Sequence, residues 1–280
     1  MDISSKVDDP ILVAVLESVQ RVAEQLNIPF FVVGAVARHI LLHYAYGLPP
    51  GRKTADFDLG FRVASWKEYR LLRSELIGSG DFQPVGNKQR MLFREAAPVD
   101  LLPFGAITDA TTKIYWPPDE DTELNLFGFE EAYESAMSVR IRATPPLDVR
   151  IASPSGLVLL KLIAWNDRKP ESRDAIDLGL LVRNYMALGN KERLVAEHED
   201  LLAVEDFDYE LAGARILARD VARICDPPTL LRVLEIIDRE LADEDDLQLV
   251  SYSADRNDTV ERSLEYWKAI RDELRIAAAL

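Results

Sequence analysis

Residues 52–63, RKTADFDLGFRV, place two aspartates inside an apolar segment that is typical of a buried strand. Successive side chains of a strand alternate between its two faces, and the chain rises about 3.3 Å per residue. Asp56 and Asp58 therefore share one face about 7 Å apart, whereas Phe57 and Leu59 share the other face and are expected in the core. Two carboxylates this close repel each other, and burial increases the cost. A cation should compensate: a divalent metal ion, or a nearby arginine or lysine. The alternative is a solvated edge strand.

Length and composition limit the class of protein. The chain has 280 residues, enough for one large domain or two ordinary ones, and 48% of them are apolar, so a sizeable core can form. No apolar run reaches the roughly 18 residues of a membrane span, and the N-terminus lacks the basic and apolar regions of a signal peptide. The single cysteine, Cys225, excludes an internal disulfide and a cysteine zinc site. These features together predict a cytoplasmic protein.

The charge is strongly acidic and unevenly distributed. A net charge of −15 disfavours broad binding to a nucleic-acid backbone, which depends on surplus lysine and arginine. Acidic residues concentrate in 117–123, 197–208 and 242–246, where we expect solvated loops and helix faces. Basic residues near the two aspartates could still attract a small polyphosphate. The basic residues gather as Arg52 and Lys53, as Lys88, Arg90 and Arg94, and as Lys161, Arg168, Lys169 and Arg173.

Hydrophobic spacing predicts an α+β protein with a mixed sheet of about five strands, followed by an all-helical region. We expect a domain boundary near residue 152, which gives a mixed domain at 1–152 and a helical domain at 153–280. Helix-capping residues are predicted at Asp9, Ser65 and Ser153. The expected elements are helices at 10–26, 35–47 and 65–80, strands at 28–35 and 56–63, three short strands within 82–105, a long polar excursion at 105–125, and a hairpin at 137–152.

Two further features accompany the aspartates. The strand at 28–35 ends at Gly34-Ala35 and turns into a helix, where backbone N–H groups and the helix dipole favour phosphate. Downstream, Asp100 lies between Val99 and Leu101 as a third carboxylate on an apolar strand. Three carboxylates suit Mg²⁺ or Mn²⁺, and two such metal ions about 4 Å apart can clamp the attacking and leaving oxygens of a phosphoryl transfer.

In these segments the sequence resembles the polymerase-β-type nucleotidyltransferases, and most closely their AbiEii/AbiGii-type subgroup of toxin–antitoxin and abortive-infection systems. The matching segments are VVGAVARHILLHYAYG, RKTADFDLGFRV and VDLLPFG, and KLIAWNDRKPESRDAIDL at 161–178 resembles the subgroup's helical K…R…RDxxD segment. The GAVAR turn is also similar to the G-G-x-V-R-D turn of CCA-adding enzymes. The chain departs from these patterns at Ala35, where the family usually has Gly or Ser, and at His39, where CCA-adding enzymes have Asp.

The resemblance implies a Mg²⁺- or Mn²⁺-dependent enzyme that moves a nucleoside monophosphate from an NTP, such as ATP, to an acceptor hydroxyl. The acceptor could be tRNA, a protein or a small molecule, and a cognate antitoxin protein is a possible partner. The resemblance assigns metal binding to Asp56, Asp58 and Asp100, and it adds for Asp100 a role in deprotonating the acceptor. It assigns backbone contacts with the triphosphate to Gly34 and Ala35.

Three further nucleotide contacts are predicted, each with a structural alternative. Arg38 is either a phosphate ligand or a surface arginine, and Thr54 either a ligand or a strand-entry residue. Lys161 either contacts a phosphate or extends from an apolar helix to the surface. Asp177 is expected to position a basic side chain. The rival function is a non-catalytic binding or antitoxin-like protein on a degenerate transferase scaffold.

Overall fold

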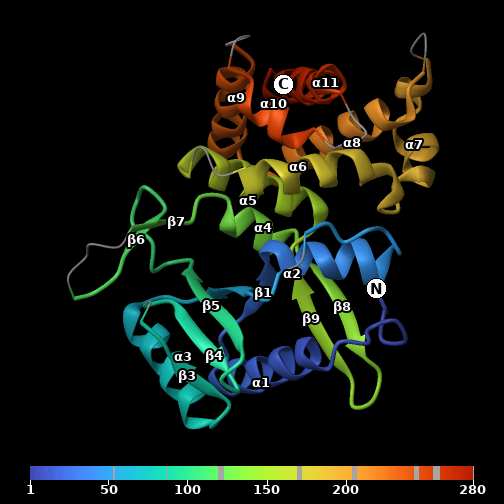
Figure 1. The fold of residues 1–280 in the computed structure, drawn as a ribbon. Helices are drawn as coiled ribbons and strands as arrows, with labels where there is room; N and C mark the ends of the chain where they lie inside the picture. Colours follow the sequence, from blue (N-terminus) through green and yellow to red (C-terminus); the bar gives the residue numbers. More distant parts are fainter. Residues whose placement is uncertain are drawn as a thin grey trace. The chain divides into compact units, whose positions relative to one another are not determined.

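The structure is a computed structural model and describes residues 1–52, 54–86, 88–118, 123–168, 172–203, 207–242, 246–254 and 259–279. Lys53, Lys169 and parts of the three acidic segments lie outside the described residues. The chain divides into two compact units, Met1–Ser153 and Pro154–Leu280 (Figure 1). Within the described residues, no helix combines the length and the apolar character that crossing a membrane requires.

The first unit is built on a mixed sheet (Figure 1). Its described strands pair in the order β3-β4-β5-β2-β1-β9-β8, and β6 and β7 form a separate two-stranded sheet. The pairs β2–β5 and β1–β9 are parallel, and the other pairs are antiparallel. The strands are β1 (Phe30–Val33), β2 (Phe57–Arg62), β3 (Phe82–Pro84), β4 (Arg90–Phe93), β5 (Ala97–Phe104), β6 (Lys113–Tyr115), β7 (Glu123–Asn125), β8 (Met137–Arg142) and β9 (Leu147–Ile151).

One prediction about this sheet was wrong. The described residues form seven strands of one sheet rather than about five, because both strands of the predicted hairpin at 137–152 join it through β9. The predicted excursion at 105–125 contains the paired strands β6 and β7, which form a sheet of their own, with residues 119–122 outside the described residues. The alternation within β2 was predicted correctly, since Phe57 and Leu59 are buried and the strand lies in the interior of the sheet.

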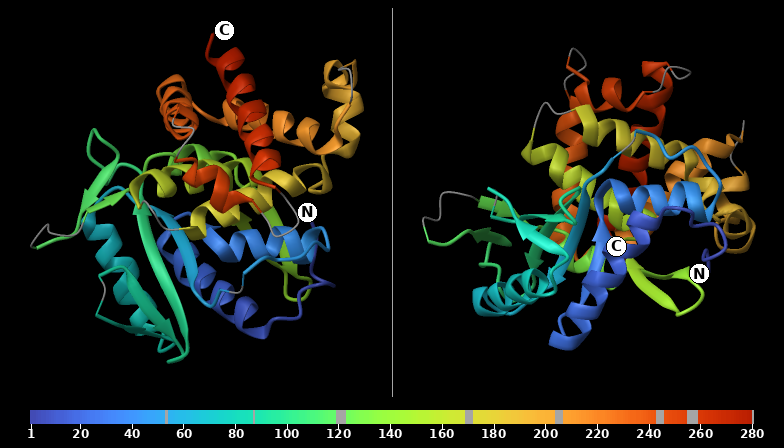
Figure 2. Two further views of the ribbon diagram at one scale, coloured as in Figure 1. Left: turned by 45° about the horizontal axis from the view of Figure 1, so that its top comes forward. Right: turned by 60° about the horizontal axis from the view of Figure 1, so that its bottom comes forward.

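Among its described residues, the first unit has four helical segments. The side chain of Asp9 caps α1 by accepting hydrogen bonds from the N–H groups of Ile11 and Leu12, and Ser65 caps α3, as predicted for both. α1 packs beside α3 and against β9 (Figure 2). The predicted helix at 35–47 is an α-helical turn that continues as a π-helix. The segments are α1 (Pro10–Leu26), α2 (Gly34–His39) continued by η1 (Ile40–Ala45), α3 (Trp66–Gly78) and α4 (Phe129–Glu134).

The second unit is helical throughout its described residues, as predicted. α8 packs against α11, and α5 packs against α6 (Figure 2). Hydrogen bonds that involve buried polar side chains also connect helices of this unit. The helices are α5 (Pro154–Asp167), α6 (Ser172–Asn184), η2 (Tyr185–Ala187), α7 (Lys191–Glu197), η3 (Glu199–Ala203), α8 (Tyr209–Ile224), α9 (Pro227–Ala242), α10 (Gln248–Ser253) and α11 (Val260–Ala278).

One buried polar group of the second unit is the carboxylate of Asp220. Arg193 donates two hydrogen bonds to it, at 2.6 and 2.8 Å, and the Tyr185 hydroxyl donates a third at 2.5 Å. Burial alone would raise the pKa of Asp220, but these charged and neutral donors outweigh it and hold that pKa below its ordinary value of 3.8.

Candidate functional site

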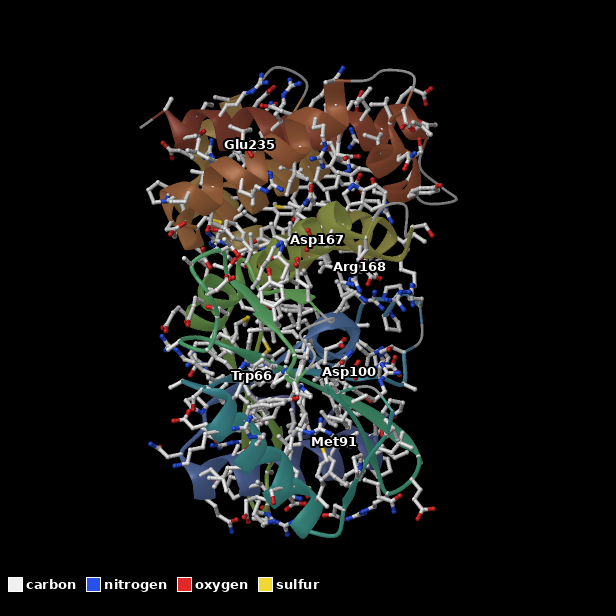
Figure 3. The ribbon with its side chains drawn as sticks, turned by 90° about the vertical axis from the view of Figure 1, so that its left-hand side faces the viewer. Trp66, Met91, Asp100, Asp167, Arg168 and Glu235 are labelled. Carbon is white, nitrogen blue, oxygen red and sulfur yellow. The ribbon has the colours of Figure 1, made fainter. Side chains whose placement is uncertain are left out.

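The register of the central strands brings two of the predicted acids together. Asp58 on β2 lies opposite Asp100 on the parallel strand β5, and opposite Val33 on the antiparallel strand β1. Arg90 on β4 lies opposite Asp100 from the other side. Because paired residues of neighbouring strands project from the same face, Arg90, Asp100 and Asp58 form one row across three strands. Figure 3 labels Asp100 within the first unit.

Asp56 precedes β2 and lies two residues before Asp58, so the two side chains share a face. The Asp56 N–H donates a hydrogen bond to the Thr54 hydroxyl at 3.3 Å, which gives Thr54 a local role at the entry to the strand. The Asp56 side chain is 46% exposed and that of Asp100 is 12% exposed. The three acids therefore lie at one end of the β2–β5 pair, and Asp56 is more accessible to solvent than Asp100.

The turn after β1 lies against Asp58. Gly34 has φ +66°, in the left-handed region that favours glycine, and it begins α2 directly after the extended residue Val33. A Cβ atom placed on Gly34 would lie 2.1 Å from Oδ2 of Asp58. The close approach of backbone and carboxylate thus requires glycine for two reasons, its φ and its missing side chain. Ala35, the next residue, is buried.

Arg90 supplies a cation to the acid row, which consists of Asp56, Asp58 and Asp100. Its Nε and one terminal nitrogen donate to the two oxygens of Asp100 at 2.8 and 2.7 Å, and the same terminal nitrogen donates to Asp56 at 3.4 Å. The hydrogen bonds to Asp100 raise the pKa of Arg90, so the guanidinium stays charged. An arginine beside the aspartates was one of the two predicted ways to compensate their charge, and in this structure it is present.

The chemistry of the acid row suits a divalent metal ion. Its donors are carboxylate oxygens, which Mg²⁺ and Mn²⁺ prefer, and a cation already lies among them. Within the described ranges, no three His, Cys, Asp or Glu side chains converge closely enough to hold a metal ion in the present arrangement. Both oxygens of Asp100 are engaged by Arg90. The residue types therefore suit the ion, whereas the side-chain arrangement with Arg90 on Asp100 does not hold it.

Arg38 is not a surface residue, so that alternative was wrong: it is 1% exposed. One of its terminal nitrogens donates to the backbone carbonyl of Arg52 at 2.9 Å, which fixes the loop that leads to the aspartates. Burial, and secondarily the charge of Arg52, lower the pKa of Arg38 to about 10. The positive charges of Arg38 and Arg52 therefore repel each other.

Lys161 belongs to the second unit and is held by two acids. Its Nζ lies 2.7 Å from Asp174 and 2.9 Å from Asp177, and both carboxylates are buried. Arg168 donates to the second oxygen of Asp174 at 2.8 Å. Lys161 is itself only 13% exposed, which argues against a lysine that merely extends to the surface. The contact of Asp177 with Lys161 agrees with its expected role of positioning a basic side chain.

Arg90 is the residue that sequence reasoning did not place in the site. It was noted only as part of a basic group, yet a signal existed in KQRMLFREA, where alternation sets Arg90 and Leu92 on one face and buried Met91 and Phe93 on the other. The pairing of β4 with β5, which sets Arg90 opposite Asp100, could not be read from that segment alone.

Comparison with known proteins gives one family match. The model of the family described as "Nucleotidyl transferase AbiEii toxin, Type IV TA system" matches residues 18–275. No curated protein matches the chain.

Solved structures with some similarity include two kinds of enzyme. The antibiotic-resistance factor ANT(2″)-Ia is 13% identical, with 69% of this chain and 96% of that chain covered and a TM-score of 0.38. A CCA-adding enzyme in apo form II is 15% identical, with 96% and 68% covered and a TM-score of 0.33. The Thermotoga maritima CCA-adding enzyme complexed with tRNA is 16% identical, with 97% and 68% covered and a TM-score of 0.27.

Proposed function

Because this chain belongs to the AbiEii family of nucleotidyl transferase toxins, and is thus a nucleotidyltransferase, we propose that it moves a nucleoside monophosphate from a Mg²⁺- or Mn²⁺-bound NTP to an acceptor hydroxyl. A bond forms between the acceptor oxygen and the α-phosphorus, the bond between the α-phosphorus and the bridging oxygen breaks, and pyrophosphate leaves. The single observation that carries this proposal is the register of Asp58 with Asp100, with the Gly34 turn against the Asp58 carboxylate.

In this proposal Asp56, Asp58 and Asp100 hold the metal ions. The bound metal would neutralise phosphate charge and stabilise the attacking and leaving oxygens. Asp100 also accepts the proton of the acceptor hydroxyl. The remaining contribution of the protein is to position the two substrates and to stabilise developing charge, which accounts for most of the catalysis in phosphoryl transfer.

The triphosphate would lie along the turn after β1. Gly34 and Ala35 offer backbone N–H groups at the start of a helical segment, where the helix dipole favours anions. Ala35 lacks the hydroxyl that the family usually has there, so the contact is through the backbone alone. The mutual repulsion of Arg38 and Arg52 supports an anion in this region, because a phosphate near them would relieve it. Thr54 is proposed as a further nucleotide contact.

Lys161 is proposed to contact a phosphate of the NTP. The buried carboxylates of Asp174 and Asp177 fix its ammonium group at a defined place. A lysine held in this way loses little conformational entropy when it meets a phosphate, which favours binding. Lysine is also a common ligand of phosphate groups in proteins.

The family context makes this enzyme a toxin component, and we propose a cognate antitoxin protein as its partner and the cytoplasm as its location. Family membership favours the transferase over the rival, a non-catalytic binding protein on a degenerate scaffold. The acceptor is proposed to be tRNA, a protein or a small molecule. The net charge of −15 makes tight binding of RNA depend on a local basic surface.

The test is transfer of label from each of four α-labelled NTPs, with Mg²⁺ or Mn²⁺, to RNA, protein and small-molecule acceptors. We expect label on one acceptor class, and loss of transfer in Asp58→Asn. Asp148→Asn is the matched control, because it also removes one aspartate charge from the first unit but breaks only an exposed ion pair with Arg140. Equal transfer by both variants would contradict the assignment of Asp58.

A further inference from the structure

Arg90 and the proposed metal ions require the same oxygens. The guanidinium fork of Arg90 takes both oxygens of Asp100 and reaches Asp56 with one of the same nitrogens. Arginine suits this task because its planar fork matches a carboxylate at two points. A metal ion bound by Asp100 together with Asp56 or Asp58 would have to break at least one of these contacts.

The position of Arg90 is set by the sheet rather than by chance rotation of a surface side chain. Arg90 lies directly opposite Asp100 in the antiparallel β4–β5 pair. Its neighbours Met91 and Phe93 are buried on the other face and keep the strand in this register. The Arg90 side chain is 31% exposed, so solvent reaches the ion pairs and can screen them. The contacts can therefore be exchanged without unfolding of the sheet.

We propose that Arg90 is a built-in competitor of the divalent metal ion, which holds Asp100 and Asp56 until metal and nucleotide arrive together. This inference rests on the proposed function. Without nucleotide, a metal ion must displace the guanidinium from at least one carboxylate oxygen, and no new anion replaces the lost contact. With nucleotide, the triphosphate offers the displaced guanidinium a new anionic partner. Metal and nucleotide therefore bind cooperatively, and Arg90 is a positioning residue that creates the coupling.

The competition makes an unusual prediction, since loss of a residue in the site should strengthen binding of a ligand. Arg90→Gln should bind Mn²⁺ about tenfold more tightly than the unmodified protein in the absence of nucleotide, because the ion no longer competes with the charge-assisted hydrogen bonds. The same variant should show a smaller gain in Mn²⁺ affinity when a non-hydrolysable NTP analogue is added. General damage to the sheet would lower Mn²⁺ affinity instead.

The experiment measures free Mn²⁺ by electron paramagnetic resonance with and without the NTP analogue. Arg94→Gln is the matched control. Arg94 directly follows β4, and its replacement also removes one positive charge, but Arg94 pairs with Asp81 rather than with the acid row. This control variant should bind Mn²⁺ like the unmodified protein. Arg90→Lys keeps the positive charge but loses the planar fork of the guanidinium. Its Mn²⁺ affinity should lie between those of Arg90→Gln and the unmodified protein, and it replaces Arg90→Gln in the test if that variant does not fold.

The outcomes separate the two proposals. In one outcome, the unmodified protein binds Mn²⁺ in the presence of the NTP analogue, but in the absence of nucleotide neither Arg90 variant binds Mn²⁺ more tightly than the unmodified protein. That outcome refutes the competition and leaves the metal site standing. If neither the unmodified protein nor the variants bind Mn²⁺ with or without the analogue, the metal-dependent function fails and the competition with it. Tighter binding by Arg90→Gln with an unchanged nucleotide effect would refute the coupling.

Discussion

Gly34 offers a test of how the site is assembled, because Gly47 in the same helical region is a matched control. Gly34 has φ +66° and Gly47 has φ +69°, so alanine is strained equally at both. A left-handed conformation costs an alanine about 1–2 kcal/mol. In a unit of this size that corresponds to a fall in melting temperature of roughly 2–8 °C. We expect both Gly34→Ala and Gly47→Ala to lose stability in this range.

The two variants differ in what the new methyl group meets. At Gly47 nothing lies within 4 Å of the added Cβ, whereas at Gly34 it would lie 2.1 Å from Oδ2 and 2.9 Å from Cγ of Asp58. The carboxylate must rotate away, and it is short enough to do so without unfolding its strand. A displacement of about 1 Å in a positioned group can cost 10²-fold in rate. Gly34→Ala should therefore lose transfer activity by about 100-fold or more, while Gly47→Ala keeps most of it.

The measurement pairs thermal melts with initial rates of label transfer at saturating NTP. The expected pattern is a similar loss of stability in both variants and a loss of rate in one. Similar rates in both variants would refute the reasoning, because the close contact of the Asp58 carboxylate with the Gly34 backbone would then have no part in catalysis. A much larger loss of stability in Gly34→Ala would show instead that Asp58 cannot yield, and that its strand must move.

Three other predictions concern stability. Lys161→Met should cost about 3–5 kcal/mol in urea unfolding, because Asp177 and Asp174, both buried, each lose an ion pair while Asp174 keeps its contact with Arg168, and Lys161→Arg should restore part of it. Asp220 should stabilise the fold above pH 4 and lose that contribution as pH falls through its depressed pKa, so Asp220→Asn should flatten the acid limb of a melting-temperature profile. Ser65→Ala should cost about 1 kcal/mol, measured by urea unfolding, through loss of the cap of α3.

The parts of the fold that follow from local chemistry could be predicted from the sequence. The caps at Asp9 and Ser65 need only a short polar side chain before a helical pattern, and both are present. Alternation alone placed Phe57 and Leu59 in the core. The three aspartates and the glycine turn were identified by their order along the chain, and their assignment to metal and nucleotide stays a prediction.

Features that depend on contacts distant in sequence could not be predicted. The place of Arg90 depends on which strand β4 joins and in which register, and a shift of one residue would turn it to the opposite face. The ion pairs of Lys161 are another such feature. The lysine contacts one oxygen of Asp174 and one oxygen of Asp177, because the packing of α5 against α6 brings these side chains together.

The central place of β1 in the sheet has a consequence for the synthesis of the protein. β1 pairs with β2 soon after in the chain, but its other edge meets β9, where Val32 pairs with Ile151. All four residues of β1 are buried in the finished sheet. While the chain is being made, this apolar edge stays open until the β8–β9 hairpin leaves the ribosome, and open apolar edges promote aggregation. A product truncated before residue 151 would carry all three aspartates, and we expect it to aggregate rather than to act as a toxin.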